Sequence, residues 1–213
     1  MSTMRDVAYR NGRSLIRAFS SIRWTPSLVL TLNYRHDLKD IPEVEGVTGS
    51  EIRRLQACEI PLLLEVWPVQ LEKMYQRLER GDRCYGLFLD GRIAHYQWYQ
   101  LQGRHFIQPA GRWMKVQKGE MVGYHVRVAD WARGRHVNLF VKTCLLREFK
   151  EEGFQSIWVY TTVNNVASQK GIEGAGWVFD EGYKALHFGS FRFPLPSTLK
   201  TKPIPTAVEH GPS

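Results

Sequence analysis

A strand–helix–strand–helix pattern over residues 126–177 constrains the fold more than any other segment. An apolar strand leads through the turn Arg133-Gly134-Arg135-His136-Val137-Asn138 into a helical stripe, and residues 156–161 follow as a buried strand. Asn165 is a typical N-cap residue for a second helix. Two strands joined by a helix in this way form a right-handed parallel crossover. The first turn of each helix also exposes unpaired backbone N–H groups, which attract anions.

Length and composition predict one main domain. The chain has 213 residues, of which 43% are hydrophobic and 12% aromatic, and this is enough to bury a sizeable core. No apolar run is long enough to span a bilayer and the N-terminus lacks a secretory signal pattern, so we expect a cytoplasmic protein. The three cysteines, Cys58, Cys84 and Cys144, are widely spaced, which argues against a disulfide framework and against a zinc site.

The formal net charge of +8 is concentrated at the two ends of the chain. Residues 1–40 hold seven Arg and Lys against three Asp and Glu, and residues 184–213 hold four against one. The middle, residues 41–183, is nearly neutral, with eighteen Arg and Lys against seventeen Asp and Glu. A basic groove for nucleic acid is therefore poorly supported, and the charge predicts basic ends that contact an anionic surface, a partner, or nothing.

The segment 1–50 is predicted to be a basic N-terminal extension. Leu15, Phe19 and Ile22 form a short apolar stripe among arginines, which is typical of a basic amphipathic helix over residues 1–24. This pattern fits a leader that packs on the domain, a helix that docks on a partner or peripherally on the inner membrane surface, or an organelle transit peptide. An extra strand at residues 29–34 and a linker at 41–49 complete the extension.

The compact domain is predicted to span residues 51–193. A short strand at 52–55 precedes a helical region at 59–76, which Pro68 should divide. Asp90-Gly91 predicts a tight hairpin between strands 84–89 and 92–98, because both turn residues tolerate positive φ. Residues 177–179 and 184–193 are expected to form a closing hairpin, and residues 194–213 a disordered, proline-rich tail.

The order of these elements resembles that of the GNAT superfamily of acyl-CoA-dependent N-acyltransferases. Two segments carry the resemblance: the turn at 133–138, in the place of the family's pyrophosphate loop, and Asn165-Val166-Ala167-Ser168 followed by Gly176-Trp177. The resemblance implies an α/β (α+β) fold. Its central sheet is mixed and mostly antiparallel, is flanked by helices, and is splayed between strands 120–129 and 156–161.

The resemblance also implies a reaction and a co-substrate. An acyl group would pass from acetyl-CoA or another acyl-CoA to a primary amine by direct attack, with no metal. The backbone of Val126 and Val128 would pair with the pantetheine arm. The pyrophosphate would bind at Arg133, Gly134, Arg135, His136, Val137 and Asn138, and the far end of the carrier at Asn165 and Ser168. The family usually has glycines where this chain has His136 and Asn138.

Glu120 stands in a position similar to that of the general-base glutamate in the histone-acetylating branch of the family. Such a group is needed because only the free-base form of an amine attacks a thioester. The alternative is an exposed charge at the start of a strand, and a bulge in the strand would decide which face Glu120 occupies. The tyrosine that many members use as a general acid is replaced by Ile172, and Tyr160, Tyr183, His187 or solvent could substitute.

Two functions remain open at this point. The first is an N-acetyltransferase that acts on a small-molecule or peptide amine. The second is a catalytically silent GNAT-like module that docks on an anionic membrane or macromolecular partner through its basic ends. The sequence identifies neither the acceptor nor the oligomeric state.

Overall fold

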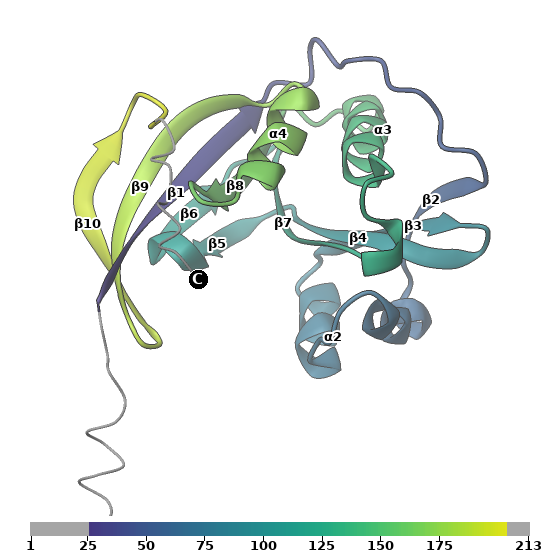
Figure 1. Ribbon diagram of the computed structural model, residues 1–213, viewed down its shortest axis with the longest axis horizontal. Helices are drawn as coiled ribbons and strands as arrows, with labels where there is room; N and C mark the ends of the chain where they lie inside the picture. The colour runs from purple at the N-terminus through teal and green to yellow at the C-terminus, as the bar shows by residue number, and fades with distance from the viewer. Residues whose placement is uncertain (1–25, 204–213) are drawn as a thin grey trace, which may run out of the picture.

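A twisted eight-stranded sheet with helices on both faces forms the frame of the protein (Figure 1). The computed structural model describes residues 26–203, so the amphipathic helix predicted at residues 1–24 lies outside the described residues. The elements in chain order are β1 (Ser27–His36), β2 (Ser50–Arg54), η1 (Ala57–Glu65), α2 (Leu71–Glu79), β3 (Arg83–Leu89), β4 (Arg92–Gln100), β5 (Gly103–Ile107), η2 (Gln108–Ala110), β6 (Arg112–Val116), β7 (Glu120–Val128), η3 (Asp130–Ala132), α3 (Val137–Glu151), β8 (Ser156–Thr162), α4 (Val166–Gly174), β9 (Val178–Phe188) and β10 (Phe191–Leu199).

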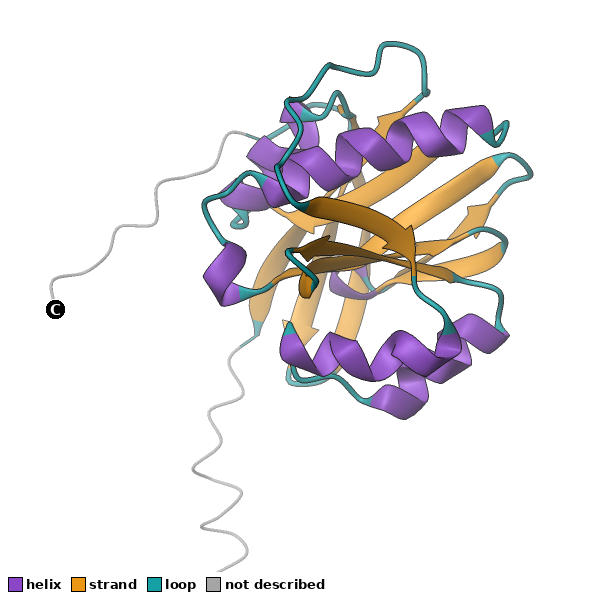
Figure 2. Ribbon diagram, turned by 90° about the vertical axis from the view of Figure 1, so that its right-hand side faces the viewer, coloured by secondary structure: helices purple, strands orange, loops and turns teal. Residues whose placement is uncertain are grey.

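The strand order in the sheet is β10-β9-β1-β8-β7-β4-β3-β2. Strands β7 and β8 are parallel, as the crossover through α3 requires, and the other neighbours are antiparallel. The predicted mixed, mostly antiparallel sheet is therefore confirmed. Helices α3 and α4 cover one face, while η1 and α2 cover the other (Figures 1 and 2).

Strand β1 lies inside the sheet rather than beside it. It pairs with β8 on one side and with β9 on the other, and its Leu32 and Tyr34 side chains are fully buried. The extra strand expected at residues 29–34 is thus present. The domain expected from the sequence, residues 51–193, leaves out this central strand. Its place in the sheet could not be predicted, because its partners β8 and β9 are far from it in the chain.

The hairpin of β3 and β4 follows the sequence expectation. Asp90 has a φ of 49° and Gly91 a φ of 79°, which are the left-handed values that a type I′ turn needs. The helical region after β2 is divided between η1 and α2 on either side of Pro68, also as expected.

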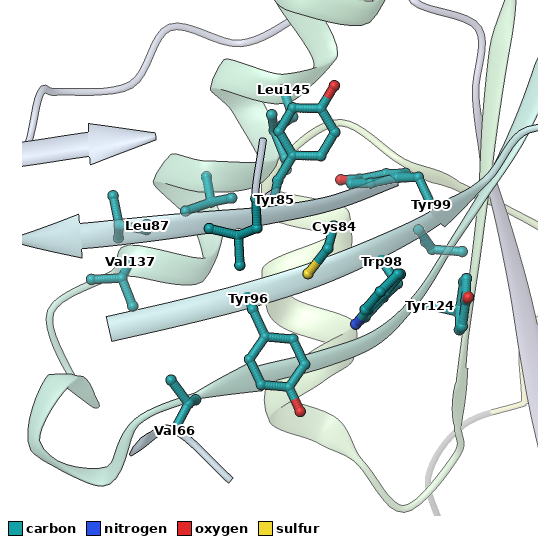
Figure 3. Close-up of a cluster of buried hydrophobic side chains, with 14 of the residues drawn as sticks. Val66, Cys84, Tyr85, Leu87, Tyr96, Trp98, Tyr99, Tyr124, Val137 and Leu145 are labelled. Atoms are coloured by element: carbon teal, nitrogen blue, oxygen red, sulfur yellow. The ribbon is translucent and has the colours of Figure 1, made fainter. Parts of the chain in front are cut away.

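Aromatic side chains from this hairpin fill the core on both faces of the sheet. Figure 3 shows Tyr85 and Tyr99 on one face and Tyr96 and Trp98 on the other. The ring of Phe149 in α3 lies edge-on to Tyr85 and Tyr99, with centroids 5.4 and 4.7 Å away. Truncating such a ring typically costs about 3–5 kcal/mol, so the hairpin and α3 hold each other in place.

The C-terminal limit of the sheet differs from the expectation. Strand β9 is continuous, and the closing hairpin joins it to β10 around Gly189, whose φ is 57°. Residues 194–199, expected in the proline-rich tail, form the second part of β10. Pro194 is tolerated there because β10 is an edge strand, where a missing backbone N–H breaks no ladder between inner strands.

A small second sheet of β5 and β6 was not predicted. Its register pairs Gly103 with Val116 and Ile107 with Arg112. It brings residues 103–116 against the open end of β7, and it supplies part of the candidate site.

Candidate active site

Strands β7 and β8 pair only over their first halves. The parallel ladder begins at Glu120 and Ser156 and ends at Gly123 and Val159. Beyond that point the strands separate around a cavity of about 610 Å³. Residues of α3 and α4 line it from one sheet face, and residues of α2, β5 and β6 from the other. The splay predicted between residues 120–129 and 156–161 is confirmed.

Gly123 stands where the strands begin to part. A Cβ at this position would lie 2.7 Å from the Gln97 side-chain nitrogen and 3.1 Å from atoms of both Tyr99 and Val159. The Gln97 nitrogen is buried and has no hydrogen-bond partner among residues 26–203. At the start of the gap, the backbone of Gly123 is therefore closely packed, and the Gln97 side-chain nitrogen is a buried donor without an acceptor among the described residues.

A bulge at His125 directs the next part of β7 into the gap. His125 has a left-handed φ of 50°, and the register between β4 and β7 shifts at this point. After the bulge, the Ala129 N–H donates to the Ala94 carbonyl of β4 at 2.8 Å. Because backbone groups alternate in direction along a strand, those of Val126 and Val128 face away from β4 and into the gap.

The turn before α3 keeps a glycine-like shape without all of the family's glycines. Gly134 has a φ of 79°, and His136, the N-cap residue, has a φ of 55°. The first helical hydrogen bond runs from the Phe140 N–H to the His136 carbonyl at 3.1 Å. The N–H groups of the three residues before Phe140 therefore have no acceptor within the helix, an arrangement that suits an anion.

Helix α4 begins beside α3. The Asn165 side chain caps it by accepting a hydrogen bond from the Ser168 N–H at 3.1 Å. The two helices approach closely at Gly171, where a Cβ would stand 3.3 Å from the Asn138 side-chain nitrogen. Asn138, Asn165 and Ser168 all line the cavity. The N-terminal turns of both helices thus reach the same wall.

Lys142 is the charged group of this wall that the sequence analysis missed. It is 2% exposed and donates to the Gln97 side-chain oxygen at 3.3 Å. Burial lowers the pKa of Lys142 to about 8. Burial also lowers the pKa of the neighbouring His95 to about 3, and the charge of Lys142 adds to that effect. A sequence signal existed, because Lys142 interrupts the buried helical stripe of α3.

On the opposite wall, three side chains form a hydrogen-bonded chain. The Gln100 side-chain nitrogen donates to two backbone carbonyls, so its oxygen accepts from His105 Nδ1 at 2.8 Å. His105 Nε2 then accepts from the Tyr160 hydroxyl at 3.0 Å. Burial, followed by the charges of Arg80 and Arg77, lowers the pKa of His105 to about 4. His105 is therefore a neutral imidazole at pH 7, with Tyr160 as its donor.

His125 is a second neutral imidazole at the cavity. Its Nδ1 accepts a hydrogen bond from the Arg77 guanidinium, and its Nε2 lies 3.5 Å from the Tyr96 hydroxyl. Burial and then the charge of Arg77 lower the pKa of His125 to about 3. His125 lines the cavity, whereas His95 does not.

Glu120 lies outside the cavity. It stands at the start of the paired part of β7, where its carboxylate accepts from the Ser156 hydroxyl and from the Gln117 N–H, both at 3.3 Å. The bulge that could have turned it into the site comes later, at His125. The structure therefore does not support the predicted role of Glu120 as the general base, and among the described residues that line the cavity none carries a carboxylate.

The predicted carrier-binding residues divide into two groups. Val126, Asn138, Asn165 and Ser168 line the cavity, whereas Val128 and residues 133–137 do not. Residues 133–136 form the turn before α3, and Val137 is the first residue of that helix. The Arg133 side chain is paired with Asp130 at 2.8 Å, and that of Arg135 lies over Trp131 at 6.0 Å.

Two further features bear on the kind of site. Within residues 26–203, no three or more His, Cys, Asp or Glu side chains are grouped so that they could hold a metal ion. The described helices are too short or too polar for any of them to cross a bilayer.

Comparison with solved structures identifies the fold. A GCN5-related N-acetyltransferase from Sphaerobacter thermophilus superposes with a TM-score of 0.58 and 13% identity, over 89% of this chain and 59% of that chain. A GNAT-family acetyltransferase from Colwellia psychrerythraea superposes with a TM-score of 0.55 and 21% identity, over 79% of this chain and 57% of that chain. A GNAT-family protein from Novosphingobium aromaticivorans superposes with a TM-score of 0.53 and 16% identity, over 75% of this chain and 64% of that chain.

These similarities establish a shared fold, that of the GNAT acetyltransferases. The alignments span 57% to 64% of the length of the three solved chains. No protein-family model matches the sequence, and the comparison with curated proteins found no match.

Proposed function

We propose that this chain, which has the GNAT fold, transfers an acyl group from acetyl-CoA or another acyl-CoA to a primary amine by direct attack. The observation that carries the proposal is the gap between β7 and β8. It joins a wall of gap-facing backbone and helix N-termini to a wall of Tyr, His and Arg side chains. A reaction between two bound substrates needs such a passage, because it holds both reacting atoms in one place.

The α3 side of the cavity suits a phosphorylated carrier with an amide-containing arm. The gap-facing backbone of Val126 and Val128 can pair with such an arm as an added strand would. The free N–H groups at the start of α3 suit phosphate oxygens, and Arg135 can add a charge-assisted contact. When bound, the acyl-CoA supplies an activated acyl group as a thioester.

Tyr160 and His105 can carry the proton that the acceptor must lose. As the Tyr160 oxygen takes a proton from the ammonium group, its own proton passes to His105 Nε2 along the existing hydrogen bond. Gln100 accepts from His105 Nδ1 and so stabilises the imidazolium that results. The same path in reverse returns the proton to the departing thiolate.

The cavity also favours a neutral amine before any proton transfer. Its charged lining residues are cationic, namely Arg77, Arg80, Arg104, Arg127 and Lys142. Nearby positive charge lowers the pKa of an amine, as it lowers the pKa of His105. A weak base such as His105 is then sufficient, and a carboxylate in the place expected for Glu120 is not needed.

Two measurements test the proposal. Isothermal titration with acetyl-CoA should show binding, and a thiol-release assay against a panel of primary amines should show turnover. Absence of binding at millimolar concentration would refute the proposal. Binding without turnover for every amine would instead support the silent GNAT-like module.

A further inference from the structure

One wall of the cavity carries positive charge that the described part of the protein leaves largely unbalanced. Arg77 comes from α2, and Arg80 is the residue directly after that helix; Arg104 comes from β5 and Arg127 from β7. From these side chains we infer that the acceptor is a primary amine that also carries an anionic group, a carboxylate or a phosphate. The inference rests on the proposed function of the same cavity.

Only one of the four arginines has an acidic partner within residues 26–203. Arg80 pairs with Asp82, a carboxylate that is 2% exposed and that also accepts from the Tyr124 hydroxyl. Arg77 donates to His125, and Arg127 donates to the Val126 carbonyl at 2.8 Å. These neutral partners satisfy donors without cancelling charge.

Aromatic faces hold the unpaired guanidinium groups in place. Arg77 lies over the rings of Trp98 and Tyr124, at 5.3 and 5.0 Å from their centroids. Arg104 lies 5.3 Å from the centroid of Trp113. Such contacts orient a guanidinium and leave its N–H edge available, and that edge matches the two oxygens of a carboxylate or a phosphate.

The histidines of the cavity do not add to this charge. Their lowered pKa values, about 4 for His105 and about 3 for His125, keep both rings neutral at pH 7. The positive charge near the acceptor therefore comes from arginines, which stay charged across the working pH range.

The position of these arginines separates them from the predicted phosphate site of the carrier. Helix α2 lies on the sheet face opposite α3, whose N-terminus suits the carrier phosphates (Figures 1 and 2). On the arginine side, Phe106 and Trp113 line the cavity and are 39% and 59% exposed. This exposed rim gives the acceptor an approach that does not cross the carrier, so the arginines face the acceptor.

Matched pairs of amines test the inference. We would measure kcat/KM for acetyl transfer to β-alanine against β-alaninamide, and to O-phosphoethanolamine against ethanolamine. The anionic member should be preferred on the order of 100-fold, since a hydrogen-bonded charge that loses its partner is costly. The pair with the larger preference identifies carboxylate or phosphate. Equal or better turnover of both uncharged members would overturn the inference and leave the proposed function standing.

A matched pair of variants locates the effect. Arg104→Gln should lower kcat/KM for the anionic acceptor on the order of 10- to 100-fold and leave acetyl-CoA affinity unchanged. Arg92→Gln is the control, because Arg92 stacks on Trp131 at 4.8 Å but does not line the cavity. Equal effects of the two variants would overturn the inference. So would a preference for succinyl-CoA with uncharged amines, because the arginines would then serve the acyl group.

Equilibrium binding keeps the inference testable if no amine is turned over. The same four amines would be titrated into the protein with saturating CoA, which occupies the carrier site. Binding of an anionic member that weakens at least 10-fold in Arg104→Gln supports the inference even if catalysis is absent. Equal binding of anionic and uncharged members would refute it.

Discussion

Replacing Lys142 with methionine should change the pH dependence of stability in a direction that the structure fixes. Lys142 is 2% exposed and has Gln97 as its hydrogen-bond partner. Burial lowers its pKa from 10.5 to about 8. The folded protein therefore binds this proton less tightly than the unfolded chain does, so protonation of Lys142 destabilises the fold.

The size of the effect follows from the two pKa values. A pKa difference corresponds to about 1.4 kcal/mol for each pH unit, so a pKa lowered from 10.5 to about 8 destabilises the fold by about 3 kcal/mol at pH 7. The cost declines as the pH rises from about 8 to about 10.5, where the unfolded chain also loses the proton. Wild-type stability should therefore rise by about 2–3 kcal/mol relative to Lys142→Met between pH 7 and pH 10.

Urea unfolding followed by tryptophan fluorescence at pH 7, 8, 9 and 10 provides the assay. Taking the difference between wild type and variant removes the contributions of other groups that titrate in this range. Lys150→Met is the control, because it replaces a lysine that is exposed on the same helix. A difference between wild type and Lys142→Met that stays constant within about 0.5 kcal/mol would refute the reasoning.

Three further substitutions test the site and its frame. Tyr160→Phe removes the hydroxyl that donates to His105, and kcat should fall by about 10²-fold or more while acetyl-CoA affinity by calorimetry is unchanged. Glu120→Gln should keep turnover within about threefold of wild type, because Glu120 does not line the cavity; a loss of about 10²-fold would restore it as the base. Asn165→Ala should cost about 1 kcal/mol in urea unfolding through loss of the Ser168 cap contact, and Asn165→Ser should recover most of it.

Features that depend on neighbouring residues could be predicted from the sequence. The Asp90-Gly91 turn needs two positive φ angles, and the chain offers residues that tolerate them. The cap of α4 likewise needs one short polar side chain at Asn165. The order strand, helix, strand around α3 was sufficient to predict the crossover. Together with the family resemblance, it also predicted the splay between β7 and β8.

Features that depend on distant contacts could not be predicted. His105 and Tyr160 meet because β5 packs against the open end of β7, and no local pattern links the two residues. The spacing of Glu120 matched the family, but the bulge at His125 follows it and so cannot direct it into the cavity. Lys142 could have been recognised, since a lysine within a buried helical stripe needs a specific partner.

The central place of β1 has a consequence for how the chain folds. Thr31 pairs with Thr162, and Ser27 pairs with His187, so β1 is synthesised long before either of its neighbours. A growing chain must carry an unpaired apolar strand until β8 and β9 have emerged from the ribosome. Pairing over such sequence distances slows folding and exposes strand edges that aggregate. We therefore expect refolding yield to fall steeply with protein concentration and to recover when a chaperone holds the chain during this interval.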